Sequence, residues 1–167
     1  MNARAASPNF AQRTVRRLIA TRPAAWALAH TIHHIDGAVF RVSGGKTTAS
    51  AILSALPILT VTTTGAKSGL PRTVTLVGIP DGERIILIAS NWGQASHPAW
   101  YYNVRANPLV GVSGAAGKQN YTARELAGKE RDLAWEKAVS LYPGYRGYAA
   151  RAGGRRIPVI LLEKTGA

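Results

Sequence analysis

Hydrophobic and polar positions follow two different periodicities along this chain. Up to residue 46 the apolar side chains recur every three or four positions, which is the period of an α-helix. From Leu59 onward, short β-branched and apolar runs alternate with turns that contain glycine and proline, a pattern typical of β-strands. We therefore treat residues 1–46 as an N-terminal helical segment and residues 47–167 as the main part of the same domain.

The N-terminal segment predicts two helices. Asn9 is placed to cap a helix over Phe10–Thr21, and Pro23 suits the first turn of a second helix, where its missing N–H is not needed. Apolar positions of the second helix recur at helical spacing: Leu28, Ile32, Ile35 and Val39. His30 and His34 lie one turn apart, a spacing that can chelate a metal, but without a third ligand we interpret them as surface histidines.

The main part predicts six strands and two further helices. The strands are expected over Thr60–Thr64, Arg72–Ile79, Arg84–Ala89, Leu109–Ser113, Gln119–Leu126 and Ile157–Leu162. The helices are expected over Pro98–Asn107 and Glu130–Tyr142, and the glycine-rich stretch Tyr142–Gly154 is expected to be irregular. Hairpin connections dominate this order. We therefore predict an α+β fold, mainly β, in which an antiparallel barrel or strongly bent sheet has helices packed at its ends.

Composition narrows the class of protein. A chain of 167 residues suits one domain. It has no cysteine, which excludes a disulfide scaffold, cysteine-ligated zinc, iron–sulfur clusters and thiol catalysis. No apolar stretch approaches the roughly 18 residues of a membrane span. Arginines in the N-terminal segment argue against a secretory signal, so we expect a cytoplasmic protein.

The net charge of +13 is unevenly distributed. Residues 1–80 hold nine Lys and Arg against one acid, and residues 81–167 hold twelve against seven. Such a field attracts polyanions, for example nucleic acid, anionic lipid or a phosphorylated cofactor. A merely soluble, self-repelling surface explains the same charge, so charge alone does not choose a partner.

One candidate site is the loop between the first two predicted strands. It resembles the end of a phosphate-binding P-loop, but Ala66 stands where that motif needs glycine and a strand follows instead of a helix, which excludes the motif. The residue types still suit an anion: the glycines let backbone N–H groups converge, and Lys67, Ser68 and Arg72 add charge and a hydroxyl. An ordinary solvated hairpin turn is the alternative.

Two aromatic patterns supply further candidates. Trp100 and Asn103 are three residues apart and share a helix face, which suits a planar ring that forms hydrogen bonds; a core tryptophan is the alternative. Tyr142, Tyr145 and Tyr148 are spaced by three. Because each buried tyrosine hydroxyl needs a partner, the wall or lid of a binding site explains them at least as well as the alternative, a place in the core. No catalytic triad or metal cluster is apparent, so demanding chemistry would belong to an organic cofactor.

Four segments together resemble the deazaflavin-dependent nitroreductases, also described as quinone reductases that use reduced coenzyme F420. They are Thr63–Arg72, Ser90–Pro108, Tyr142–Tyr148 and Arg156–Val159. The resemblance covers about residues 56–163. It implies a split β-barrel that binds 8-hydroxy-5-deazaflavin, coenzyme F420. FMN on the same barrel is less favoured, because the Lys-Ser-Gly-x-Pro-Arg loop resembles the deazaflavin branch.

The resemblance also implies site residues. It assigns Lys67, Ser68 and Arg72 to the phosphate and the start of the oligoglutamate tail. The remaining implied cofactor-binding residues are Thr73, Val74, Ala89, Ser90, Asn91, Ala99, Trp100, Asn103 and Tyr145. The implied catalytic residues on the acceptor side are Tyr142, Tyr145, Tyr148 and Ser90. Asn91 departs from the family, some members of which carry lysine there, and so does the loop 92–96. These departures leave the acceptor open.

Two functions from different classes follow. The leading hypothesis is an oxidoreductase that transfers a hydride from reduced coenzyme F420 to a quinone, nitroaromatic or activated-enone acceptor, with no nucleic-acid partner. The alternative is a non-enzymatic basic module that binds nucleic acid or an anionic membrane surface through the helix Phe10–Thr21. Both agree with a peripheral contact at the inner face of the cell membrane if the acceptor is a membrane quinone. The oligomeric state is left open.

Overall fold

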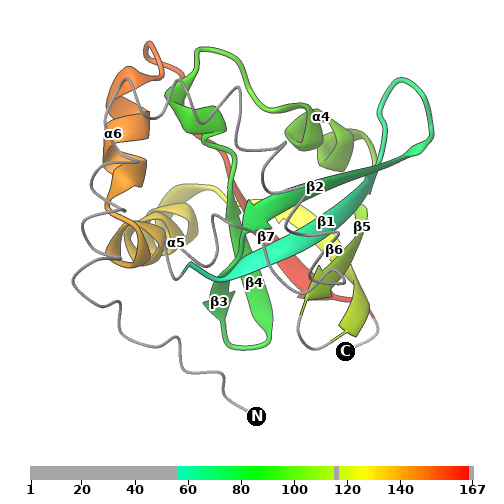
Figure 1. The fold of residues 1–167 in the computed structure, drawn as a ribbon. Helices are drawn as coiled ribbons and strands as arrows, with labels where there is room; N and C mark the ends of the chain where they lie inside the picture. The colour runs from blue at the N-terminus through cyan, green and yellow to red at the C-terminus, as the bar shows by residue number, and fades with distance from the viewer. Residues whose placement is uncertain (1–55, 115–116, 166–167) are drawn as a thin grey trace.

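The structure is a computed structural model that describes residues 56–114 and 117–165, so both helices predicted before residue 46 lie outside the described residues. Its strands are β1 (Ile58–Thr64), β2 (Pro71–Val77), β3 (Ile79–Asp81), β4 (Arg84–Ile88), β5 (Leu109–Gly114), β6 (Gly117–Glu125) and β7 (Val159–Lys164). The helical elements are the 3-10 turn η1 (Asn91–Gly93), α4 (Ala99–Ala106), α5 (Gly128–Leu141) and α6 (Gly144–Arg151). Figure 1 shows α4 beside the β1–β2 loop, and α5 and α6 on the other side of the sheet.

All seven strands form one antiparallel sheet in the order β2-β1-β5-β6-β7-β4-β3. The two edge strands, β2 and β3, are consecutive in the chain and only Gly78 separates them. Strands at opposite edges can be this close in sequence only if the sheet curls until its edges approach each other (Figure 1). This curled sheet with three helices confirms the predicted split-barrel α+β fold.

The predicted single strand over Arg72–Ile79 is wrong in one respect, because the chain changes partners within it. Residues before Gly78 pair with β1, and residues after it pair with β4. At the break, the Gly78 N–H donates to the Pro57 carbonyl at 2.8 Å. A Cβ at this position would overlap the Leu59 side chain, so glycine is what allows the partner change.

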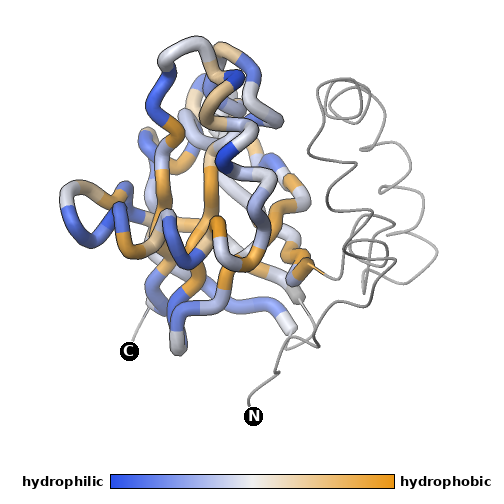
Figure 2. Tube along the Cα trace, turned by 90° about the vertical axis from the view of Figure 1, so that its left-hand side faces the viewer, coloured by the Kyte–Doolittle hydropathy of each residue, from blue (hydrophilic) through white to orange (hydrophobic). Residues whose placement is uncertain are grey.

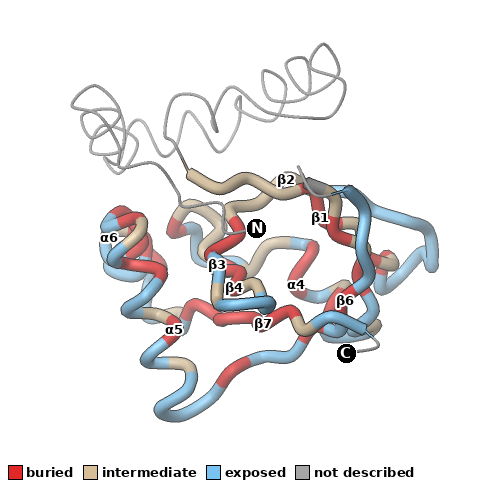
Figure 3. The backbone as a smooth tube through the Cα atoms, turned by 90° about the horizontal axis from the view of Figure 1, so that it is seen from below, coloured by how far each residue is buried: buried red, intermediate tan, exposed pale blue. Residues whose placement is uncertain are grey.

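Strands β4 and β7 are buried on both faces, which explains their nearly continuous apolar sequences. One face packs against α5 and α6 through Ile86, Ile88, Val159 and Leu161. The other face packs into the barrel and against α4 through Leu87, Ala89, Ile160 and Leu162. Figure 3 shows β7 buried along most of its length, and Figure 2 shows hydrophobic stretches along the strands with hydrophilic ones at the loops. Each buried Val, Leu or Ile side chain contributes about 1.5–3 kcal/mol of burial free energy.

The region Tyr142–Gly154 corrects a second prediction, because it contains the helix α6 rather than an irregular loop. Two glycines in eight residues lower intrinsic helix stability by about 1 kcal/mol each. The helix forms because it buries Tyr145 and Tyr148 against β4 and α5. Gly144 is required at its start, since a Cβ there would overlap the Tyr142 ring. Among the described helices, none combines the length and apolarity that crossing a membrane requires.

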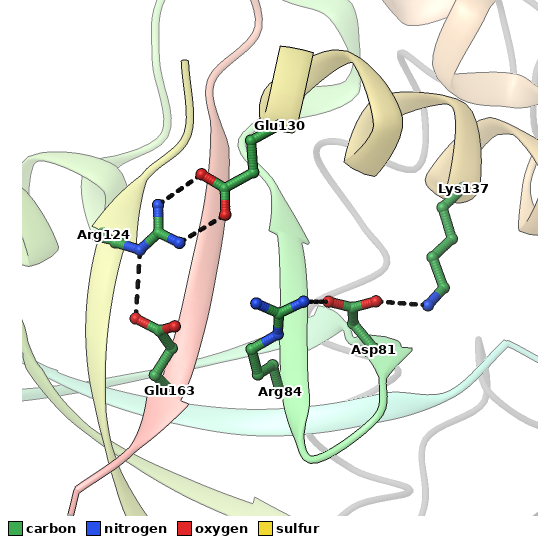
Figure 4. A network of polar contacts seen from close by, with 6 residues as sticks. All are labelled: Asp81, Arg84, Arg124, Glu130, Lys137 and Glu163. Carbon is green, nitrogen blue, oxygen red and sulfur yellow. Dashed lines mark hydrogen bonds and ion pairs between the residues drawn. The ribbon is translucent and has the colours of Figure 1, made fainter. Parts of the chain in front are cut away.

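Two groups of ion pairs fasten α5 to the barrel (Figure 4). Arg124 of β6 donates to both carboxylate oxygens of Glu130 at 2.6 and 2.8 Å, and to Glu163 of β7 at 3.2 Å. Asp81 of β3 accepts from Arg84 at 2.6 Å and from Lys137 of α5 at 2.7 Å. The hydrogen bond from Lys137, followed by the charges of Lys137 and Arg84, lowers the pKa of Asp81.

We predict that Lys137→Met lowers the free energy of unfolding at pH 7 by about 0.5 kcal/mol, the size expected for a half-exposed ion pair. Because the Asp81 pKa is lowered by folding, this stabilisation is present above the unfolded-state pKa of about 3.9 and is lost as pH falls through the folded value. Urea unfolding at pH 7 and pH 2.5 measures the difference. Lys129→Met on the same helix is the control, and an equal loss at both pH values would contradict the electrostatic explanation.

Candidate functional site

A groove with a volume of about 1,030 Å³ runs between the β1–β2 hairpin and α4 and ends at η1. Nine residues implied by the resemblance line it: Lys67, Ser68, Arg72, Thr73, Val74, Asn91, Ala99, Trp100 and Asn103. Seven further lining residues were not predicted: Thr63, Gly65, Ala66, Pro98, Tyr102, Arg105 and Ala106. A cavity of this size accommodates a small molecule or cofactor.

The hairpin loop owes its shape to hydrogen bonds among its own residues. The N–H of Gly65 donates to the Leu70 carbonyl at 2.9 Å, and the N–H of Gly69 donates back to the Gly65 carbonyl at 2.8 Å. The Leu70 N–H donates to the Ser68 hydroxyl oxygen at 3.3 Å. The amides of Gly65, Gly69 and Leu70 thus close the loop. Around them the loop offers an anion the side chains of Lys67, Ser68 and Arg72.

Asn103 fixes this loop to α4. Its Oδ1 accepts from the Ala66 N–H at 3.0 Å, and its Nδ2 donates to Thr63 Oγ1 at 3.0 Å. The Thr63 hydroxyl in turn donates to the Arg72 carbonyl at 3.2 Å. Both ends of the Asn103 amide are thus engaged within the protein. Asn103 lines the groove as predicted, but its observed contacts shape the groove and position the loop.

The charged side chains among the described residues that line the groove are all positive. Among the described residues, three cationic side chains line it, Lys67, Arg72 and Arg105, and no acidic one does. Within the described ranges, none of these three forms a salt bridge. Val74, Ala99 and the largely buried Trp100 supply apolar surface beside them. The arrangement fits a ligand that combines negative charge with a flat or apolar part.

The connection from β4 to α4 forms the far end of the groove, and its backbone is strained. Asn91 and Trp92 adopt φ angles of 49° and 57°, and Gly93 follows at 80°. Left-handed conformation costs a non-glycine residue about 1–2 kcal/mol. The Asn91 side chain lines the groove while its Nδ2 donates to the Ser96 carbonyl at 3.0 Å. Ala89, which is fully buried, and Ser90 precede this turn and do not line the groove.

The three tyrosines lie in the hydrophobic core and not at the wall of the groove. Tyr142, Tyr145 and Tyr148 are only 3–4% exposed, and none of them lines the groove. The hydroxyls of Tyr142 and Tyr148 lie 3.0 Å apart and satisfy each other, which makes their burial possible. Burial, followed by the neighbouring Tyr142, raises the pKa of Tyr145 and of Tyr148 above the ordinary tyrosine value. These two phenols are therefore neutral at physiological pH.

The tyrosines nevertheless contact the far end of the groove indirectly. Trp92 packs edge-on against Tyr148 with ring centroids 5.9 Å apart. A Cβ on Gly93 would lie 2.8 Å from the Tyr148 carbonyl oxygen, so η1 sits directly on α6. The connection from β4 to α4 thus separates the groove from the tyrosine cluster and contacts both.

Two of the groove residues that were not predicted could have been found from the sequence. Tyr102 and Ala106 follow Ala99 at three and seven positions, so helical spacing alone places them on the face that carries Asn103. Arg105 carried no comparable signal, because it lies at the edge of that face. Residues 56–114 and 117–165 contain no cluster of three His, Asp or Glu side chains that could hold a metal ion.

We predict that Asn103→Ala accelerates hydrogen exchange at the Ala66 amide about fivefold, the factor that corresponds to the roughly 1 kcal/mol of one hydrogen bond. Exchange followed by NMR measures this. Asn107→Ala is the matched control, because Asn107 lies just after the same helix and its Oδ1 accepts from the Leu109 N–H instead. Unchanged exchange at Ala66 in Asn103→Ala would show that the loop does not depend on α4.

Comparisons with known proteins agree with this geometry. The family described as F420H(2)-dependent quinone reductase matches residues 33–164. The F420H(2)-dependent quinone reductase Rv1261c of Mycobacterium tuberculosis (strain ATCC 25618 / H37Rv) is 32% identical over 136 residues, which covers 78% of this chain and 88% of that protein.

Solved structures give the same result. The F420-H2 dependent reductase FDR-A is 44% identical with a TM-score of 0.59, over 64% of this chain and 94% of that chain. A chain described as a domain-swapped dimer is 36% identical with a TM-score of 0.61, over 85% of this chain and 100% of that chain. These matches confirm the resemblance identified from the motifs, and with it an oxidoreductase that uses coenzyme F420. This chain is a member of the F420H(2)-dependent quinone reductase family.

Proposed function

We propose that this protein transfers a hydride from reduced coenzyme F420, held in the groove, to a quinone. Nitroaromatic compounds and activated enones are further acceptors under the same proposal, since each takes a hydride at an electron-poor carbon or nitrogen centre. The observation that carries the proposal is that the described residues lining the groove include Lys67, Arg72 and Arg105 but no acid, and that these three form no salt bridge within the same part of the chain.

The residues of the groove fit the cofactor. Its tail is a phosphodiester followed by carboxylates, and Lys67 and Arg72 at the hairpin end are suited to bind such a tail. The Ser68 hydroxyl accepts one hydrogen bond from Leu70 and keeps its own proton for a phosphate oxygen. Along the groove, Val74 and Trp100 supply the apolar walls that a flat ring system needs.

The far end of the groove is where we propose the reaction occurs. When bound there, the deazaflavin ring supplies the hydride. Asn91 orients the ring end, and the close packing of η1 on α6 keeps water out from behind it. Tyr142, Tyr145, Tyr148 and Ser90 stay the residues proposed for the acceptor side, although none of them lines the groove and the phenols lie behind η1. The phenols of Tyr145 and Tyr148 stay neutral, and their contribution under this proposal is to support the reactive end through η1.

We predict that the protein binds oxidised coenzyme F420 with a Kd of about 1 μM or below, and FMN far more weakly. Lys67→Ala and Arg72→Ala should each raise the Kd for F420 about tenfold or more, because each removes a charge-assisted hydrogen bond worth about 1.5–3 kcal/mol. Titrations that follow cofactor fluorescence measure both effects. Lys129→Ala is the matched control: it removes one exposed lysine of α5, outside the groove.

Three outcomes would contradict the proposal. An equal loss of affinity in Lys129→Ala would indicate that only the overall positive charge matters. Binding of FMN as tight as that of F420 would assign the groove to a different cofactor. Binding of neither would remove the groove as a cofactor site and favour the alternative of a basic, non-enzymatic module.

A further inference from the structure

Arg155 lies between α6 and β7 and binds the connection from β4 to α4 at three points. Its Nη1 donates to the Ala89 carbonyl at 3.3 Å, and its Nη2 donates to the Ser90 carbonyl at 2.8 Å. Nε and Nη2 donate to the Gln94 carbonyl at 3.1 and 3.0 Å. Nη1 also lies 2.9 Å from His97 Nδ1. One guanidinium thus holds the beginning, the middle and the end of this connection.

The contacts use the particular geometry of arginine. A guanidinium carries five N–H donors in a rigid planar fork, whereas a lysine ammonium is a single point on a flexible stem. Among the described residues, Arg155 has no carboxylate partner; its interactions are with backbone carbonyls and one imidazole. A half-buried cation held in this way serves to fix backbone position.

His97 extends the attachment to α4. Because a guanidinium can only donate, His97 accepts through Nδ1, so its ring is neutral and carries its proton on Nε2. Burial, followed by the charge of Arg155, lowers the pKa of His97, which agrees with the neutral ring. The ring packs against Tyr101 of α4 with centroids 4.7 Å apart. Arg155 therefore also sets where α4 begins.

The held segment needs such support. Asn91 and Trp92 have strained, left-handed backbones, and strain of this kind persists only where the surroundings over-determine the conformation. The same turn places Asn91 in the groove and Gly93 against Tyr148. A loop released by Arg155 would relax at Asn91 and Trp92 and lose both placements.

We propose that Arg155 is a positioning residue for the reaction: it holds the Ser90–His97 connection in the one conformation that sets Asn91 against the reactive end of the groove. This inference rests on the proposed function. Because the phosphate and tail are assigned to Lys67 and Arg72 at the opposite end, loss of Arg155 affects the rate of hydride transfer far more than the affinity for the cofactor.

The test compares Arg155→Met and Arg155→Lys with Arg156→Met, which changes the neighbouring, exposed arginine. The first readout is hydrogen exchange in the unliganded protein at Gly93 and Gln94, whose N–H groups donate within η1 to Ser90 and Asn91. In Arg155→Met we expect exchange there to rise about tenfold or more, with the amides of β4 and β7 unchanged. Arg156→Met should exchange as the wild type does.

The second readout is kinetic. In Arg155→Met we expect kcat for quinone reduction to fall about 10- to 100-fold, the cost of a misplacement of about 1 Å, while the Kd for F420 changes less than about threefold. Arg155→Lys should not restore kcat, because it keeps the charge but not the fork. Arg156→Met should keep both constants.

Several results would overturn the inference. Wild-type exchange at Gly93 and Gln94 in Arg155→Met would show that the turn does not depend on Arg155. Full activity in Arg155→Lys would show that charge alone suffices. Faster exchange shared by β4 and β7 would reduce the role of Arg155 to general stability. Failure of the wild-type protein to bind F420 would instead overturn the proposed function, and the exchange measurement, made without cofactor, keeps the two failures distinguishable.

Discussion

The rest of the structure depends on the single-residue link at Gly78. Since β2 and β3 are opposite edges of one sheet and only Gly78 separates them, the sheet has to curl. Curling encloses β4 and β7 between two layers of side chains and leaves β2 at an edge whose outer side pairs with no further strand of residues 56–114 and 117–165. The groove forms along this edge, between the β1–β2 hairpin and α4. The position of the site is thus a consequence of how the barrel closes.

Two long-range contacts then give the groove its shape, and both run from a polar side chain to backbone. Asn103 on α4 holds the hairpin at Ala66, and Arg155 holds the connection from β4 to α4. Each replaces the regular hydrogen bonding that a loop lacks. Asn103 lies on α4, and His97, which Arg155 contacts, lies just before α4. Both ends of the groove are therefore positioned relative to this one helix.

Periodicity predicted most of the fold, since strand and helix patterns depend on local burial that the sequence shows directly. It could not predict the partner change at Gly78, which depends on which strands meet. Nor could it predict α6, because Gly144 and Gly147 weaken a helix that forms only through the packing of Tyr145 and Tyr148. Nine of the residues that line the groove were found through spacing and resemblance. The contacts of Arg155 were not, because its partners lie 58 to 66 residues away in sequence.

The burial of the tyrosines changes what they can contribute to the proposed reaction. A phenol whose pKa is raised by burial keeps its proton, so its neutral hydroxyl donates one hydrogen bond and can accept another, as the paired hydroxyls of Tyr142 and Tyr148 require. A hydride acceptor gains negative charge in the transition state, and a neutral donor stabilises that charge without being consumed. Under the proposed function, the cations at the tail end of the groove bind the cofactor, while the buried tyrosines reach the reactive end only through η1, so binding and support of the reaction fall to different parts of the fold.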